Sequence, residues 1–372
     1  MKPPSISRRK CIKTGLMGTL GMAFIPTLAA NNSVPKKYQR EARYYKVTGR
    51  GVKCTLCPNE CNISLNDTGD CRTRINRDNK LYTTAYGNPC AIHIDPVEKK
   101  PLYHFLPGSR SFSIATAGCN LVCLNCQNWQ ISQATPAETR NQELFPEQVV
   151  ASSIGNNCQS IAYTYAEPLV FYEYTYDSSE KAHQEGIKNI LVSNGYVNEE
   201  PLRKLTKVID AANIDLKSFS DDIYVRLNTG SLEPVLRTLK ILKEEGVWLE
   251  ITNLVIPGWT DDMDMVKEMC GWLTKNSFDE TPIHFSRFFP QYKLQQLPAT
   301  PANTLTKARN IALQEGLKFV YIGNLPGSNA SNTLCPKCHQ VVIERKGFRI
   351  MKNNLTEGKC QFCHAPVPGV WS

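Results

Sequence analysis

Strand-like and helix-like segments alternate through most of this 372-residue chain, and that alternation constrains its fold more than any other feature. Apolar segments rich in β-branched or aromatic residues predict strands at residues 112–117, 160–165, 189–193, 212–216, 247–256, 283–288 and 319–322. Helix-like segments lie between them at residues 146–154, 169–185, 200–209, 233–245, 261–275 and 304–315. Such alternation indicates parallel strands joined by right-handed crossovers. Six or seven units are too few for a closed eight-fold barrel, so the sequence predicts an α/β fold with an open, partial barrel of the (βα)6 type.

The cysteines of the chain are numerous and grouped. Eleven of the fifteen form three short-spaced groups, Cys54/Cys57/Cys61/Cys71, Cys119/Cys123/Cys126 and Cys335/Cys338/Cys360/Cys363. Paired C-x-x-C spacings in a chain of this length are typical of metal sites, whereas disulfide-rich secreted proteins are small. We therefore expect metal ligands in the three groups and small buried side chains at Cys90, Cys158 and Cys270.

The middle group directly follows the first predicted strand. Cys119, Cys123 and Cys126 have spacings of three and two residues, so one loop can wrap one face of a metal cluster. Three thiolates can ligate three irons of a [4Fe–4S] cluster and leave the fourth iron open. An open position on a metal is typical of a reactive site, whereas closed four-ligand sites are structural or carry electrons.

This C-x3-C-x2-C motif resembles the signature of the radical S-adenosylmethionine (SAM) superfamily. The resemblance implies that SAM binds the open iron, and that one electron cleaves it to methionine and a 5′-deoxyadenosyl radical that abstracts hydrogen from a substrate. Other stretches resemble the AmmeMemoRadiSam-system radical SAM enzymes, relatives of the glycyl-radical activating enzymes such as those of pyruvate formate-lyase. These stretches are Cys54-Thr-Leu-Cys57-Pro, Thr164-Tyr-Ala-Glu167-Pro168, Ser193-Asn-Gly195, Asp215-Leu-Lys217, Ile256-Pro-Gly258 and Tyr321-Ile-Gly-Asn324.

Polar residues follow successive predicted strands, where the carboxyl ends of a parallel sheet would bring them together. Glu167 follows the second strand, Ser193 and Asn194 the third, and Asp215 and Lys217 the fourth. By the resemblance, Glu167 would contact the SAM amino group, and the other four would hold its ribose and carboxylate. Taken singly, these residues are also compatible with a helix start, a plain turn and a surface ion pair.

The last cysteine group has the pairwise spacing of a zinc ribbon or a rubredoxin-like module. A tetrahedral four-thiolate site can be closed by Cys335, Cys338, Cys360 and Cys363. Zinc is the favoured metal for this site, and iron is the alternative. Zinc ribbons usually carry glycine after each C-x-x-C, where this chain has His339 and His364.

The first group, Cys54, Cys57, Cys61 and Cys71, can bind zinc or an accessory iron–sulfur cluster. A structural metal is slightly favoured because nothing nearby in the sequence suggests a redox partner. In an exported protein, two disulfides are the alternative.

The N-terminus resembles a twin-arginine export signal. Arg8 and Arg9 precede an apolar, glycine-rich segment from Thr14 to Ala30, which predicts a targeting segment outside the fold. Export to the periplasm or cell surface is expected, and a basic N-terminus of a cytoplasmic protein is the alternative. The predicted organisation is a signal (1–30), a linker with a Cys-rich module (31–108), a radical SAM core (109–328) and a four-Cys module (329–372).

The charge distribution narrows the expected partners. Residues 1–50 carry eleven Lys or Arg and one acid, so this segment is +10 and the rest of the +9 chain is about −1. A neutral body has no excess positive charge with which to hold a phosphate backbone, so we expect no nucleic-acid partner. No apolar run beyond the leader is long enough for a stable membrane span.

Two further partners follow from the resemblance. It implies a low-potential electron donor of the flavodoxin or ferredoxin type and makes a protein substrate a candidate.

A non-catalytic iron–sulfur electron carrier is the competing function, and an assay for SAM cleavage would distinguish it from the enzyme. A zinc-ribbon adaptor is disfavoured by the large predicted barrel.

Overall fold

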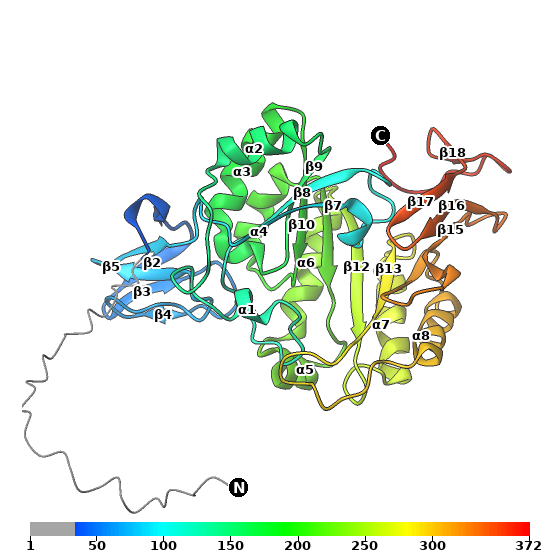
Figure 1. Cartoon of the computed structure of the whole chain (residues 1–372). Helices are drawn as coiled ribbons and strands as arrows, with labels where there is room; N and C mark the ends of the chain where they lie inside the picture. The colour runs from blue at the N-terminus through cyan, green and yellow to red at the C-terminus, as the bar shows by residue number, and fades with distance from the viewer. Residues whose placement is uncertain (1–33) are drawn as a thin grey trace, which may run out of the picture. The chain divides into compact units, whose positions relative to one another are not determined.

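The computed structural model describes residues 34–372, so the predicted leader lies outside the described residues. An eight-stranded sheet with the order β14-β13-β12-β11-β10-β9-β8-β7 forms its centre (Figure 1). The strands are β7 (Ala91–Pro96), β8 (Arg110–Ala115), β9 (Ser160–Tyr163), β10 (Lys188–Ser193), β11 (Ala211–Asp215), β12 (Trp248–Val255), β13 (Ile283–Arg287) and β14 (Val320–Gly323). All seven predicted strands are confirmed to within two residues at each end.

Strands β8 to β14 are parallel, and each pairs with the next strand along the chain. Every crossover therefore advances in the same direction. This order keeps the connecting helices on one face of the sheet, as in a barrel, whereas a doubly wound sheet reverses direction. The predicted α/β fold with a parallel sheet is confirmed.

A helix follows each of the first six parallel strands (Figure 1). These helices are α2 (Pro146–Gly155), α3 (Tyr172–Gln184), α4 (Glu199–Leu205), α6 (Leu232–Glu244), α7 (Met263–Lys275) and α8 (Ala302–Gln314). Helix α6 shows why they form, because Val235, Leu239 and Leu242 recur at helical spacing and are all buried. Helix α7 begins where the Asp262 side chain accepts hydrogen bonds from the next backbone N–H groups.

The segment before the parallel strands contains two small antiparallel sheets and one strand of the main sheet. The first small sheet contains β1 (Arg40–Glu41), β6 (Lys80–Thr83) and β5 (Arg74–Arg77), in that order. The second contains β2 (Tyr45–Thr48), β3 (Gly51–Cys54) and β4 (Asn62–Ile63). Strand β7 falls in residues 31–108, the range predicted for the N-terminal module, yet it pairs antiparallel with β8 over six residues. The main sheet thus begins earlier in the chain than the predicted core.

The C-terminal segment forms β15 (Thr333–Leu334), β16 (Val341–Lys346), β17 (Arg349–Asn353), β18 (Leu355–Thr356) and β19 (Lys359–Cys360). Buried Arg345 of β16 joins these strands to the connection before β8. Its guanidinium donates to the carbonyl oxygen of Tyr103 at 2.6 Å and lies 4.0 Å from the buried carboxylate of Glu98. Among residues 34–372, no helix is long and apolar enough to cross a membrane.

Candidate metal and cofactor site

The loop with Cys119, Cys123 and Cys126 leaves the carboxyl end of β8. Backbone N–H groups of Val122 and Leu124 donate to carbonyl oxygens of Asn228 and Leu227 in the π-helical turn Tyr224–Asn228. These bonds fix the path of the loop between the first and third cysteines. The three thiols are therefore presented at the strand end, as the sequence predicts.

Glu167 joins the second and third strand ends in one buried network. One oxygen of its carboxylate accepts from the Ser193 hydroxyl at 2.7 Å and the Leu169 N–H at 3.1 Å, and the other from the Asn194 N–H at 2.8 Å. Glu167 thus caps the 3-10 turn Pro168–Phe171 and also fixes the end of β10. The second oxygen keeps acceptor capacity for a further donor, because a carboxylate accepts about four hydrogen bonds.

Burial governs the electrostatics of this network. Glu167 is only 2% exposed, and desolvation raises the pKa of its carboxyl to about 7 against the opposing hydrogen bonds from Asn194 and Ser193. The Asn194 side chain also donates to the Asn120 side-chain oxygen at 2.8 Å and lies 3.8 Å from the Cys119 sulfur. The predicted SAM contacts Glu167, Ser193 and Asn194 therefore lie next to the first cysteine of the loop.

Asp215 and Lys217 follow β11 and contact each other, with the ammonium 2.8 Å from the carboxylate. The Lys217 charge also acts on Cys123. Burial raises the pKa of the Cys123 thiol, and the nearby ammonium opposes this rise. Lys217 is thus a cation beside the cysteine loop, and its charge also acts on Glu167.

Unsatisfied polar atoms surround the cysteines. Oδ1 of Asn125 and Oε1 of Gln133 are buried and have no hydrogen-bond partner among the described residues, and the buried Asn228 amide interacts with the Cys123 thiol. Buried polar atoms are normally paired, so these atoms fit a polar group that binds near the loop. Asn228 lies beside Cys123 and was missed by the sequence analysis, since nothing marks a lone Asn before Thr229 as functional.

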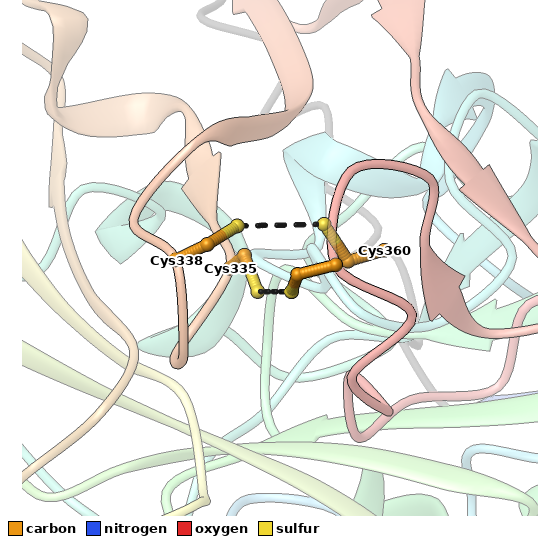
Figure 2. A group of neighbouring side chains, drawn as sticks. Cys335, Cys338 and Cys360 are labelled. Carbon is orange, nitrogen blue, oxygen red and sulfur yellow. Dashed lines mark hydrogen bonds between the residues drawn. The ribbon is translucent and has the colours of Figure 1, made fainter.

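The C-terminal cysteines form a compact site (Figure 2). The sulfurs of Cys335 and Cys363 are 3.5 Å apart, those of Cys338 and Cys360 are 3.7 Å apart, and all four lie within 4.8 Å of one another. Four thiolates at about 2.3 Å from one zinc ion would have sulfur–sulfur distances of about 3.8 Å. The predicted four-Cys group is therefore confirmed as an arrangement that can hold one metal ion.

Backbone geometry explains how histidines replace glycines in this site. His339 and His364 both have φ of 59°, the left-handed conformation that glycine adopts without strain. Their N–H groups donate to the carbonyl oxygens of Cys335 and Cys360, which closes each knuckle. Burial opposes ionisation of Cys335, but backbone N–H groups of Cys338 and Lys337 lower the pKa of its thiol to about 7.

The N-terminal cysteines have a different geometry. Cys54, Cys57, Cys61 and Cys71 line one cavity of about 20 Å³. In the described part of the chain, only the C-terminal group brings three or more Cys, His, Asp or Glu ligand atoms within 4.8 Å of one another. In neither this group nor the group at Cys119, Cys123 and Cys126 do three sulfurs lie that close together.

His284 lies near the amino end of β13, away from the cysteine loop. Its ring nitrogen is 2.6 Å from the buried carboxylate of Glu250 on β12, which also accepts from the N–H groups of Tyr103 and His104. These bonds give His284 a structural role in the core.

The loops after β11 and β12 border an open cleft of about 510 Å³. Phe219 and Trp259 supply apolar surface, and Asp261, Asp262 and Glu268 supply acidic groups. The cleft lies at the carboxyl ends of the strands, the edge on which substrates bind in barrel enzymes.

Comparison with known proteins decides the family. Residues 113–270 match the model of the radical SAM superfamily. The chain is 44% identical over 327 residues to an uncharacterized protein of Methanocaldococcus jannaschii, covering 87% of this chain and 97% of that protein. This chain belongs to the radical SAM superfamily. It is also homologous to the pyruvate formate-lyase 1-activating enzyme of Escherichia coli, at 26% identity over 58% of this chain and 93% of that enzyme.

Solved structures similar to this chain include radical SAM enzymes. A domain of the pyruvate-formate lyase-activating enzyme of Bacteroides vulgatus has a TM-score of 0.39 at 17% identity and covers 44% of this chain and 99% of its own. A radical SAM methyltransferase of Sphaerobacter thermophilus has a TM-score of 0.46 at 14% identity and covers 59% of this chain and 67% of its own.

Proposed function

We propose that this radical SAM protein is an enzyme that reductively cleaves SAM and uses the product radical to abstract hydrogen from a substrate. Cys119, Cys123 and Cys126 would hold a [4Fe–4S] cluster, which with SAM and one electron supplies a 5′-deoxyadenosyl radical. The observation that carries the proposal is that these thiols lie beside both the buried Glu167 network and Lys217, at the carboxyl ends of the parallel strands.

The protein residues have separate tasks in this proposal. The free acceptor position of Glu167 is suited to the amino group of SAM, and Ser193 and the Asn194 N–H hold that carboxylate in place. Lys217 is suited to the SAM carboxylate, which would share the ammonium with Asp215. Glu167, Ser193 and Asn194 are buried, and the low dielectric constant around them strengthens their polar contacts.

The core is proposed to be the partial (βα)6 barrel expected from the sequence, with the substrate entering from the cleft beside Trp259. Homology to activating enzymes, which act on a protein, supports a protein substrate. The proposed electron source is a one-electron, low-potential donor of the flavodoxin or ferredoxin type.

The C-terminal site is proposed to hold one structural metal, with zinc favoured. Its close sulfur spacing and closed knuckles support a role in folding rather than in turnover. Metal analysis of the purified full chain tests this: about one zinc per chain is expected, and its persistence after all four cysteines are replaced by serine would contradict the assignment.

Anaerobic reconstitution with iron, sulfide, SAM and dithionite tests the enzymatic proposal. The wild type should form 5′-deoxyadenosine, and a triple Cys119→Ala, Cys123→Ala, Cys126→Ala variant should form none. A variant with Ala at Cys90, Cys158 and Cys270 is the matched control for the loss of three thiols, and it should retain activity. SAM cleavage by the variant without Cys119, Cys123 and Cys126 would refute the assigned cluster ligands. A wild-type protein that binds the cluster but does not cleave SAM would favour the electron-carrier alternative.

Residues 1–30 are proposed to act as a twin-arginine export signal. The paired arginines followed by an apolar segment support this. Replacing Arg8 and Arg9 by lysine should retain the protein inside the cell, whereas wild type should be processed and exported. Full-length, uncleaved wild type found only in the cytoplasm would refute the signal.

A further inference from the structure

The four N-terminal cysteines come from one compact module and line one cavity. Cys54 ends β3, Cys57 and Cys61 belong to the connection to β4, and Cys71 precedes β5. Cys54 and Cys71 are buried and the other two are half-buried. Ile63, Leu169 and Val170 make much of the wall of this cavity of about 20 Å³ apolar.

Sulfur spacing argues against a single zinc ion in this cavity. Four thiolates around one zinc ion lie about 2.3 Å from the metal, which brings their sulfurs to about 3.8 Å from one another. The C-terminal group of the same chain has that close spacing, and the N-terminal group does not. In a [4Fe–4S] cluster each thiolate binds a different iron, so the four sulfurs stand further apart around a central space.

Disulfides are also disfavoured. All fourteen cysteines in residues 34–372 are free, including these four. No hydrogen bond joins any two of the four sulfurs in this part of the chain, in contrast with the two close sulfur pairs of the C-terminal site. A cavity without paired sulfurs is what four ligands of one multi-iron cluster would leave.

One buried hydrogen-bond donor without a partner belongs to a residue that lines the cavity. Nε of the buried Arg74 has no partner among the described residues, and this side chain lines the cavity. Donors of this kind stabilise thiolates and cluster sulfides.

We propose that Cys54, Cys57, Cys61 and Cys71 bind a second [4Fe–4S] cluster with all four irons ligated by the protein. Arg74 stabilises its negative charge, and Glu173, 2.8 Å from the guanidinium, holds the Arg74 side chain in place. A closed cluster has no position for SAM, so its chemistry is the gain and loss of one electron.

The cavity directly adjoins the loop of the proposed catalytic site. A Cβ on Gly118, the residue before Cys119, would lie 2.5 Å from the Cys71 carbonyl oxygen. Asn120 lines the cavity, accepts a hydrogen bond from the Asn59 side chain at 2.9 Å, and lies within the C-x3-C-x2-C motif. The two cysteine groups are thus joined by backbone contact and by one shared residue.

This contact assigns the second site a role in electron supply, which rests on the proposed function. One electron from a flavodoxin- or ferredoxin-type donor would enter at the Cys54 group and leave through the Gly118–Asn120 segment toward Cys119. The donor is oxidised by one electron, SAM is the final acceptor, and the N-terminal site returns to its starting oxidation state after each turnover.

Acid-labile sulfide tests the cluster without any reference to activity. The triple Ala variant at Cys119, Cys123 and Cys126 leaves the N-terminal module intact, so after anaerobic reconstitution it should retain about four sulfides per chain. Iron at the C-terminal site would add no sulfide. Reduction with dithionite should give a paramagnetic signal of a [4Fe–4S] cluster that SAM leaves unchanged.

Further replacement of Cys57 by serine in that triple variant should remove or strongly reduce the sulfide, whereas Cys90→Ser, the matched control, should not. In the triple variant, the absence of sulfide or only two sulfides per chain would overturn the proposal.

The electron path is tested separately in the otherwise wild-type chain. Cys57→Ser should lose 5′-deoxyadenosine formation driven by a reduced flavodoxin and keep formation driven by dithionite, which is small enough to reduce the catalytic site directly. Equal loss with both reductants, or no loss, would refute the path. If wild type forms no product with either reductant, the proposed function fails while the sulfide result stands.

Discussion

Replacing Glu167 by glutamine is the sharpest test of the proposed SAM site, because the two side chains have nearly the same shape. The carboxylate accepts from Ser193, Leu169 and Asn194. An amide has one oxygen, so in either orientation one backbone N–H loses its acceptor at a cost of about 1–3 kcal/mol of folding stability. Loss of the charge-assisted bond to the SAM amino group should cost about 1.5–3 kcal/mol, or roughly 10- to 150-fold in Kd.

The assay is equilibrium binding of SAM to the anaerobically reconstituted protein. Glu250→Gln is the matched control, because Glu250 is also buried and accepts from two backbone N–H groups, at the amino end of the strands. Both variants should lose thermal stability, and only Glu167→Gln should bind SAM more weakly. Equal SAM affinities in wild type and Glu167→Gln would refute the assigned contact.

The pH dependence of SAM affinity gives a second readout. Desolvation raises the pKa of Glu167 to about 7, and a bound amino group favours the charged carboxylate. Protonation therefore competes with SAM below pH 7, and the ratio of wild-type to Glu167→Gln affinity should fall by up to about tenfold per pH unit. Titration of SAM itself affects both proteins alike, so a ratio that is constant from pH 5 to 7 would contradict this reasoning.

Folding stability of the SAM-free protein should change with pH in the opposite sense. Between pH 4.5 and about 7 the folded protein binds more protons at Glu167 than the unfolded chain does, so stability decreases as the pH rises. The decrease is of the order of 3 kcal/mol and is complete above pH 7. Glu167→Gln lacks this contribution, and denaturant unfolding at pH 5 and pH 8 measures the difference.

Two further predictions concern the C-terminal segment. Glycine at His339 or His364 should raise the free energy of unfolding by up to about 1 kcal/mol, because each has φ of 59°, and His339→Ala, which keeps the Cβ, should give no gain in denaturant unfolding. Arg345→Met should cost about 3–5 kcal/mol, since it leaves the Glu98 carboxylate buried without its cation, and a melting temperature equal to wild type would show that this pair is not needed.

The parallel strands were predictable because both of their faces are buried, which makes them short, nearly continuous apolar segments. Strand β7 escaped prediction because its two faces are not buried in this way. It is an antiparallel edge strand that contains His93, Asp95 and Pro96, and its side chains are mostly half-buried or exposed. The π-helical turn before Asn228, which holds the cysteine loop, also has no pattern in the sequence that would predict it.

The spacing of Cys119, Cys123 and Cys126 marks them as candidate ligands from the sequence, but the contacts around them could not be predicted in the same way. Glu167 accepts hydrogen bonds from both Ser193 and Asn194 because of the register between β9 and β10. In this register Leu191 pairs with Tyr163, and no local sequence pattern specifies it. Lys217 could equally have been a surface residue, and only packing places its charge near Cys123.

The two four-cysteine groups show why spacing does not determine metal chemistry. In the C-terminal group, backbone bonds from His339 and His364 curl each C-x-x-C into a knuckle, and strands β16 and β17 lie between the two pairs in sequence, so the sulfurs converge on one point. In the N-terminal group, Cys54 ends β3, Cys71 lies in the connection before β5, and the Ile63 side chain lines the same cavity. No backbone knuckles draw these four sulfurs to one point as in the C-terminal group, which is why the two groups are proposed to bind different metal centres.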